Sequence, residues 1–230
     1  MKNRILAISA AALAVIVACS AQAQDISFNG GVTSDYVTRG TSQANHQPSY
    51  SAGVDLTTDS GFYVGAWTGT VDFGDGTDLE YDVYGGYRTT ASGWGLDFGV
   101  ASYNYANDPG DGFDMVEALV VGTRSFGNVG TTLTIAYSPD YFNLGTSSVW
   151  SDAALSYPLT AKASVSGGVG YQFIENDSLF PSYSTANVGV GYAISANLSA
   201  DLRYTINDLD ENVVGFFADD SVSVGLTAVF

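Results

Sequence analysis

The sequence feature that most restricts the fold of this chain is an alternation of apolar with small or polar residues at a period of two. It recurs from Ile26 to Phe230, and no stretch in between has a convincing helical period. One clear example is the run Ala186, Val188, Val190, Tyr192 and Ile194. Because successive side chains of a β-strand point to opposite faces, this period predicts strands with two different faces.

The alternating segments are long for strands. We predict twelve of them, at residues 26–39, 48–57, 62–73, 78–89, 94–105, 113–125, 129–138, 148–157, 160–173, 184–194, 197–207 and 220–230. A tilted strand needs about 9–11 residues to cross a bilayer, whereas strands of soluble proteins average about 5–6. The two faces of the first, third and sixth segments are poorly resolved. In the sixth segment, two alternating sets of residues could each form the same face of the strand: one contains Glu117 and the other contains Val116.

The connections between segments alternate between short and generally longer. A transmembrane barrel has short periplasmic turns and longer external loops, and an even strand count places both chain ends on the periplasmic side. A soluble β-sandwich would also alternate along its strands, but its loops need not alternate in length. The pattern therefore predicts an all-β fold, a single transmembrane antiparallel β-barrel of twelve strands.

Aromatic residues mark both ends of the expected outer faces, where amphipathic rings prefer the level of the lipid headgroups. The set toward the longer loops is Tyr50, Tyr81, Tyr137, Tyr171 and Tyr204. The set toward the short turns is Phe62, Tyr87, Trp94, Tyr157, Tyr192 and Phe230.

The N-terminus reads as a signal for export. Lys2 and Arg4 precede an apolar run over residues 5–18, and small residues flank a cleavage position after Ala23. We predict a cleaved signal peptide at 1–23 and a barrel domain at 24–230. Lipidation at Cys19 is the alternative, because the preceding residues resemble a lipobox.

Composition excludes several classes of protein. The net charge of −17 becomes −19 once Lys2 and Arg4 are removed, and so acidic a chain repels nucleic-acid phosphates. The single cysteine rules out a disulfide scaffold. Abundant aromatic residues argue against disorder. We expect no nucleic-acid partner.

Three motifs carry a resemblance to a known family. They are the segment Asp35 to Gln43 (DYVTRGTSQ), the segment Gly61 to Trp67 (GFYVGAW) and the segment Tyr81 to Tyr87 (YDVYGGY). With the chain length and a C-terminal strand that ends in Phe230, they resemble the TorF-type porin family of proteobacterial proteins, a family of unknown function. The resemblance implies a barrel in the outer membrane of a Gram-negative bacterium and a pore, but supplies no solute and no site residues.

Alternation also predicts which charged residues line the lumen. The candidates are Asp35, Arg39, Asp55, Glu80, Asp82, Arg88, Asp97, Asp152, Lys162, Asp201 and Arg203. The excess of acids predicts a porin-like channel for passive diffusion of small hydrophilic solutes or ions, with a mild preference for cations. The alternative is a non-conducting structural or surface-interaction barrel that acts through its acidic external loops. Expected partners are outer-membrane lipid, lipopolysaccharide, small hydrophilic solutes and, through the strand that ends in Phe230, the barrel-assembly machinery.

Two segments bear on whether the lumen is open. Arg39 lies beside Gly40, either at a constriction or as an anchor that pairs with Asp35 or a carboxylate of a neighbouring strand. Residues 213–217 (VVGFF) are unusually apolar for an external loop. This composition suits a plug in the barrel mouth, contact with lipid or contact with a partner.

Catalytic and cofactor motifs are absent from the sequence, so we expect neither an enzyme nor a bound cofactor. The single histidine, His46, has Ser42 and Ser49 nearby, but a catalytic Ser–His pair needs a base oriented by a third group. No glycine-rich phosphate loop or Cys/His cluster is visible. Four acids, at positions 72, 75, 78 and 80, offer oxygen ligands for calcium, but they lack the spacing of a known calcium loop and read as a solvated turn.

Overall fold

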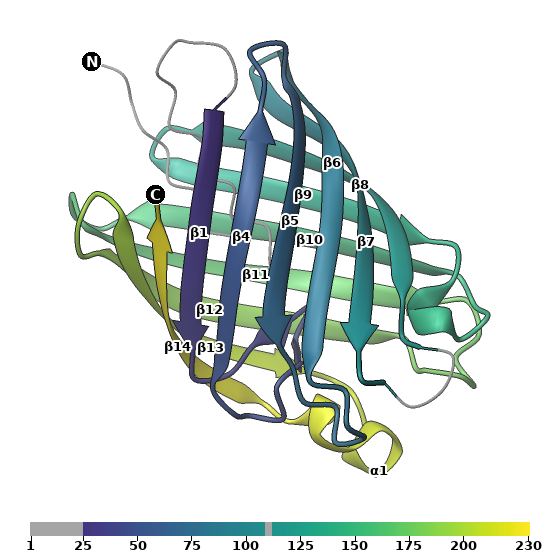
Figure 1. Cartoon of the computed structure of the whole chain (residues 1–230). Coiled ribbons are helices and arrows are strands. Elements are labelled where there is room, and N and C mark those ends of the chain that lie inside the picture. The colour runs from purple at the N-terminus through teal and green to yellow at the C-terminus, as the bar shows by residue number, and fades with distance from the viewer. Residues whose placement is uncertain (1–24, 109–111) are drawn as a thin grey trace.

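The chain folds into one closed antiparallel β-barrel of twelve strands, as the sequence predicts (Figure 1). The computed structural model describes residues 25–108 and 112–230. The predicted signal peptide, its cleavage position and Cys19 lie outside the described residues. The barrel strands are β1 (Asp25–Thr33), β4 (Ser49–Thr57), β5 (Phe62–Thr70), β6 (Leu79–Ala91), β7 (Trp94–Ala106), β8 (Met115–Phe126), β9 (Val129–Ser138), β10 (Ser148–Pro158), β11 (Ala163–Ile174), β12 (Tyr183–Ala193), β13 (Leu198–Asn207) and β14 (Ser221–Val229).

Each strand pairs with its neighbours in chain order, and β1 closes the barrel by pairing with both β4 and β14. The remaining elements are the two-residue strands β2 (Val37–Thr38) and β3 (Thr41–Ser42), the short helix α1 (Glu211–Val214) and the 3₁₀ turns η1 (Tyr141–Asn143) and η2 (Gly215–Ala218). None of the helices in the described ranges is long and apolar enough to cross a membrane.

Connections alternate in length around the barrel. The long ones, at 34–48, 71–78, 107–114, 139–147, 175–182 and 208–220, all leave from one end, here called the loop end. The short ones, at 58–61, 92–93, 127–128, 159–162 and 194–197, lie at the other end, here called the turn end. The start of β1 and the C-terminus also lie at the turn end, opposite α1 (Figure 1).

The outer surface is an apolar band. At every second position the strands expose a large apolar side chain, among them Val83, Val100, Val120, Ile135, Leu155, Val169, Val188, Leu202 and Val224. The predicted aromatic sets are also exposed on this surface, apart from the half-buried Trp94. An exposed apolar surface of this extent is unfavourable in water and is typical of a barrel that faces lipid.

Three strand boundaries differ from the prediction by three residues or more, and one of them is the end of β5, at Thr70 instead of residue 73. The first barrel strand ends at Thr33 instead of residue 39, because the chain leaves the wall there and turns into the barrel. The predicted strand 160–173 begins only at Ala163, because the Thr160 hydroxyl accepts the backbone N–H groups of Lys162 and Ala163 and holds a tight turn. Lys162 is therefore an exposed turn residue and not a lumen residue.

Candidate functional site

The first loop, residues 34–48, folds into the barrel. It carries the β2–β3 hairpin, and Gly40 to Ala44 at and beyond the hairpin tip are buried. Arg39 and Gly40 occupy the tip with φ values of 49° and 88°, the left-handed pair that a two-residue hairpin turn requires. A Cβ at Gly40 would run into the Thr185 side chain, so only glycine lets the tip approach the barrel wall this closely.

Arg39 reaches across the lumen to the wall. Its two terminal nitrogens donate to the two carboxylate oxygens of Glu117, at 2.7 and 2.6 Å, and Nη1 lies 3.4 Å from Oε1 of Gln172. The guanidinium also lies 5.4 Å from the ring centroid of Trp150. Glu117 has 0% exposed side-chain surface. Both side chains are largely removed from water, so each charge depends on the opposite charge of its partner for stabilisation.

This pairing shows that Arg39 is an anchor, but its partner is Glu117 of β8 and not Asp35. That Arg39 also lies at a constriction of a pore stays a prediction. The sequence left Glu117 outside the candidate set because the faces of its segment competed. Buried Met115 and Glu117, against exposed Val116, now show which face points inward.

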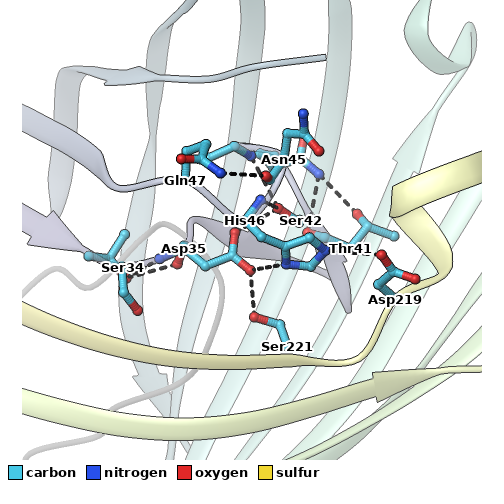
Figure 2. Close-up of polar contacts among 12 residues, drawn as sticks. Ser34, Asp35, Thr41, Ser42, Asn45, His46, Gln47, Asp219 and Ser221 are labelled. Carbon is cyan, nitrogen blue, oxygen red and sulfur yellow. Dashed lines mark hydrogen bonds and ion pairs between the residues drawn. The ribbon is translucent and has the colours of Figure 1, made fainter. Parts of the chain in front are cut away.

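A second group of contacts fastens the base of the first loop (Figure 2). The Asp35 carboxylate accepts hydrogen bonds from the hydroxyls of Ser42 at 2.6 Å and Ser221 at 2.5 Å, and lies 2.9 Å from Nδ1 of His46. Nε2 of His46 faces Asp219 at 3.5 Å. Both hydroxyls donate to the carboxylate and neither bonds the imidazole ring, so the cluster has the geometry of a clamp and not of a Ser–His nucleophile.

Aromatic residues fill the side of the lumen formed by β5 to β7. Tyr63, Tyr84 and Ala101 form a buried cluster, against which Trp67 and Tyr103 pack. The Tyr84 hydroxyl donates to Asp55 at 2.7 Å. On this side of the barrel the interior is therefore packed with aromatic rings, and the Tyr84 hydroxyl among them is hydrogen-bonded to an interior carboxylate.

A separate ion pair lies nearer the turn end. Nε of Arg88 donates to Asp97 at 2.9 Å, and the Tyr63 hydroxyl donates to the other oxygen of the same carboxylate at 2.7 Å. The Arg88 guanidinium also lies 3.8 Å from the Tyr63 ring centroid. This group links β5, β6 and β7 across the interior.

The opposite side of the lumen holds a cavity of about 250 Å³. Its wall, from β10 to β14 and β1, is rich in small residues, and the first loop forms its inner boundary. The charged residues that line it are Asp35, Arg39, Asp152, Asp201 and Arg203. Arg203 is held by Asp201 at 3.1 Å, by Asn187 and by Ser166. Asp152 accepts the Trp150 indole N–H at 3.1 Å and is not in a salt bridge with any described residue.

The structure thus brings together most of the residues predicted for the lumen. Eight lie on inward strand faces, namely Asp55, Glu80, Asp82, Arg88, Asp97, Asp152, Asp201 and Arg203, and two, Asp35 and Arg39, lie on the inward-folded loop. That they line a conducting path stays a prediction.

Aromatic side chains from several loops meet at the loop end. Phe73 packs against Tyr105, Phe113 and Phe217, with ring centroids 5.3 to 6.0 Å apart. The two ends of the apolar segment 213–217 therefore differ: Phe217 packs against this cluster, whereas Val213 is 66% exposed. The loop that enters the lumen is the first one, not this last one.

Comparison with known proteins places the chain in a family. A family model described as "Bacterial protein of unknown function (Gcw_chp)" matches residues 18–230. The chain belongs to the Gcw_chp family. This family model carries no functional name, so the resemblance to TorF-type porins stays a prediction. A search of the curated proteins finds no match to the sequence.

Solved structures similar to this Gcw_chp member are outer-membrane porins and channels. The KdgM porin has a TM-score of 0.59 at 9% identity, over 89% of this chain and 98% of that one. The NanC porin has a TM-score of 0.56 at 11% identity, with the same two coverages. The COG4313 outer membrane channel from Pseudomonas putida F1 has a TM-score of 0.54 at 12% identity, over 92% and 96%. At these identities the likeness concerns the fold.

Proposed function

We propose that this protein is a narrow outer-membrane channel through which small hydrophilic solutes or ions diffuse passively, with a preference for cations. The observation that carries the proposal is the imbalance of charge inside the barrel. The inward carboxylates of the described residues are Asp35, Asp55, Glu80, Asp82, Asp97, Glu117, Asp152 and Asp201, whereas the inward guanidiniums are Arg39, Arg88 and Arg203. A low-dielectric wall around an excess of one sign concentrates the opposite ion.

The outer surface supports a place in the outer membrane. An exposed apolar band with aromatic residues at both edges suits contact with lipid, and the similar solved structures are porins and a channel. In this proposal the signal peptide directs export and is cleaved after Ala23. The long loops then face outward, toward lipopolysaccharide, and the strand that ends in Phe230 is recognised by the barrel-assembly machinery.

The path that we propose runs along the β10–β14 side. Tyrosine and tryptophan rings pack on the β5–β7 side, and residues of the first loop border the cavity. The small-residue wall borders the cavity of about 250 Å³, which leaves room for a hydrated ion or a small solute on that side. A twelve-stranded barrel narrowed in this way conducts weakly compared with an open porin of 16–18 strands.

Planar-bilayer recording of the purified, refolded protein tests the proposal. We expect discrete conductance steps, and under a salt gradient a reversal potential of the sign that a cation-preferring pore gives. A reversal potential that shows anion preference would contradict the charge argument. A correctly folded barrel without conductance would instead favour the non-conducting alternative, in which the acidic external loops carry the function.

A further inference from the structure

Two buried carboxylates on β6 have no counter-charge among the residues that the structure describes. Glu80 and Asp82 are 3% and 4% exposed, and their spacing of two places both on the inward face, about 7 Å apart along the strand. Oε2 of Glu80 and Oδ1 of Asp82 have no hydrogen-bond partner among the described residues. Buried oxygens of this kind normally have partners, so the pair needs an explanation.

The arginines of the lumen do not supply the missing charge. Arg39 pairs with Glu117, Arg88 with Asp97 and Arg203 with Asp201, and no salt bridge among the described residues includes Glu80 or Asp82. Two ionised carboxylates that are removed from water without a cation are strongly unfavourable. Something positive must therefore accompany them when they are charged.

The surroundings of the pair are rich in oxygen and poor in soft ligands. The hydroxyls of Tyr36 and Tyr105 lie within hydrogen-bonding reach of the Glu80 carboxylate, whose Oε2 stays without a partner. Asp82 pairs across the sheet with Trp67 and Tyr103. The one histidine of the chain is engaged elsewhere, with Asp35 and Asp219. Oxygen donors without nitrogen or sulfur select hard cations over transition metals.

We propose that Glu80 and Asp82 form a binding site for one hard divalent cation, with Ca²⁺ as the best fit. The two carboxylates match its charge, and its flexible coordination accepts hydroxyl and water oxygens as the remaining ligands. Because no group of three or more His, Cys, Asp or Glu side chains in the described residues is placed to hold a metal, neutral oxygens have to complete the shell. Since Tyr36 belongs to the first loop, the bound ion also fixes that loop against β6.

This site differs from the acidic turn that precedes it. Asp72 and Asp75 accept the backbone N–H groups of residues 74 and 77, and Asp78 accepts the side-chain amide of Asn107. These three carboxylates stabilise the conformation of the loop 71–78 through their hydrogen bonds. Glu80, in contrast, faces the interior of the barrel. The triple variant D72N/D75N/D78N is therefore a matched control, because it removes acidic charge close by but outside the site.

Terbium luminescence and thermal unfolding of the refolded full chain test the proposal. We expect Tb³⁺ to bind with a stoichiometry of one, to be sensitised by Trp67 and the neighbouring tyrosines, and to be displaced by Ca²⁺. Calcium should raise the Tm relative to EDTA. Both effects should vanish in E80Q/D82N and persist in D72N/D75N/D78N. In EDTA the E80Q/D82N variant should melt no lower than the natural protein, because it lacks the uncompensated charges.

Three results would overturn the site. The first is a Tm indifferent to calcium but raised in EDTA on mild acidification, which would mean that a shared proton neutralises the pair. The second is a calcium effect that survives E80Q/D82N and disappears in D72N/D75N/D78N, which would place the ion in the external loop. The third is an E80Q/D82N variant that melts below the natural protein in EDTA. None of these readouts uses conductance, so the inference stands or falls apart from the proposed channel.

Discussion

Replacing Arg39 by alanine leaves the Glu117 carboxylate, which has no exposed surface, without its cationic partner. Breaking a buried pair from one side costs about 3–5 kcal/mol, because the remaining charge stays desolvated. The wall of the barrel is a continuous ladder of twelve strands, and the first loop is the part that can give way. At about 1.4 kcal/mol per factor of ten, this loss reduces the docked population of the loop by roughly 150- to 4,000-fold relative to the undocked one.

The other fastenings of the loop decide how far it moves. At the base of the loop, Asp35 keeps its bonds to Ser42 and Ser221. At the tip, the hydrogen bond of 2.9 Å from the Asn207 amide to the Gly40 carbonyl is a weaker attachment, which the loss of the ion pair leaves to hold the tip. A charged hydrogen bond contributes about 1.5–3 kcal/mol and a neutral one about 1 kcal/mol. The pair with Glu117 is therefore the largest single attachment. We expect R39A to leave the barrel folded while the hairpin tip leaves the wall.

Single-channel recording and thermal unfolding together measure this effect. In R39A we expect larger conductance steps and a lower Tm. The double variant R39A/E117A should lose less stability than R39A alone, because no unpaired carboxylate remains. R124A is the matched control, since Arg124 lies at the turn end and donates to the carbonyl of Ser92. An R39A channel with the conductance, noise and Tm of the natural protein would refute the reasoning that this pair holds the loop.

Three further predictions concern the cavity and the wall. D152N leaves two carboxylates and two guanidiniums in the cavity lining, where the natural protein has three and two. The ratio of cation to anion permeability, measured from the reversal potential, should therefore approach one. D59N in the exposed turn 58–61 should leave this ratio unchanged. Ser223 lines the cavity, so S223F should reduce the conductance step without a comparable change in Tm. In G86A the new Cβ would run into a backbone carbonyl of the paired strand β7 and cost about 1–3 kcal/mol in denaturant unfolding, whereas G30A, whose Cβ would meet nothing closer than 3.6 Å, should change little.

The wall of the barrel follows from the sequence because its signals are local. Alternation within most segments indicates which side chains face outward, and the alternation of loop lengths indicates the topology. The twelve predicted segments match the twelve barrel strands, apart from boundary shifts. These are largest where local pattern and tertiary contact disagree. Residues 35–39 continue the alternation of β1, yet the chain enters the lumen there because Arg39 finds Glu117, 78 positions further along the sequence.

A contact with a distant segment explains one of the other differences, and a local turn explains another. Nothing near Glu117 in sequence tells which of two competing faces points inward, since its partner comes from the first loop. Lys162 fits the alternation of its segment, but the Thr160 hydroxyl caps the turn and delays the strand. Glu80 is both a predicted lumen residue and a member of the acidic run at 72–80. The fold keeps the first interpretation, with Asp78 in the external loop and Glu80 inside the barrel.

The interior is asymmetric for a physical reason. A loop that enters a barrel brings backbone and side-chain polar groups with it, and each needs a partner away from bulk water. Here Glu117 provides the partner for the Arg39 side chain at the hairpin tip, and the hydroxyls of Ser42 and Ser221 provide partners for Asp35 at the base of the loop. The loop is therefore held to the barrel wall at two defined positions. Tyrosines pack together on one side, and the docked loop borders a cavity against the small residues of β10–β14. The dimensions and charge of any path through this protein therefore depend on fifteen residues of loop as much as on twelve strands of wall.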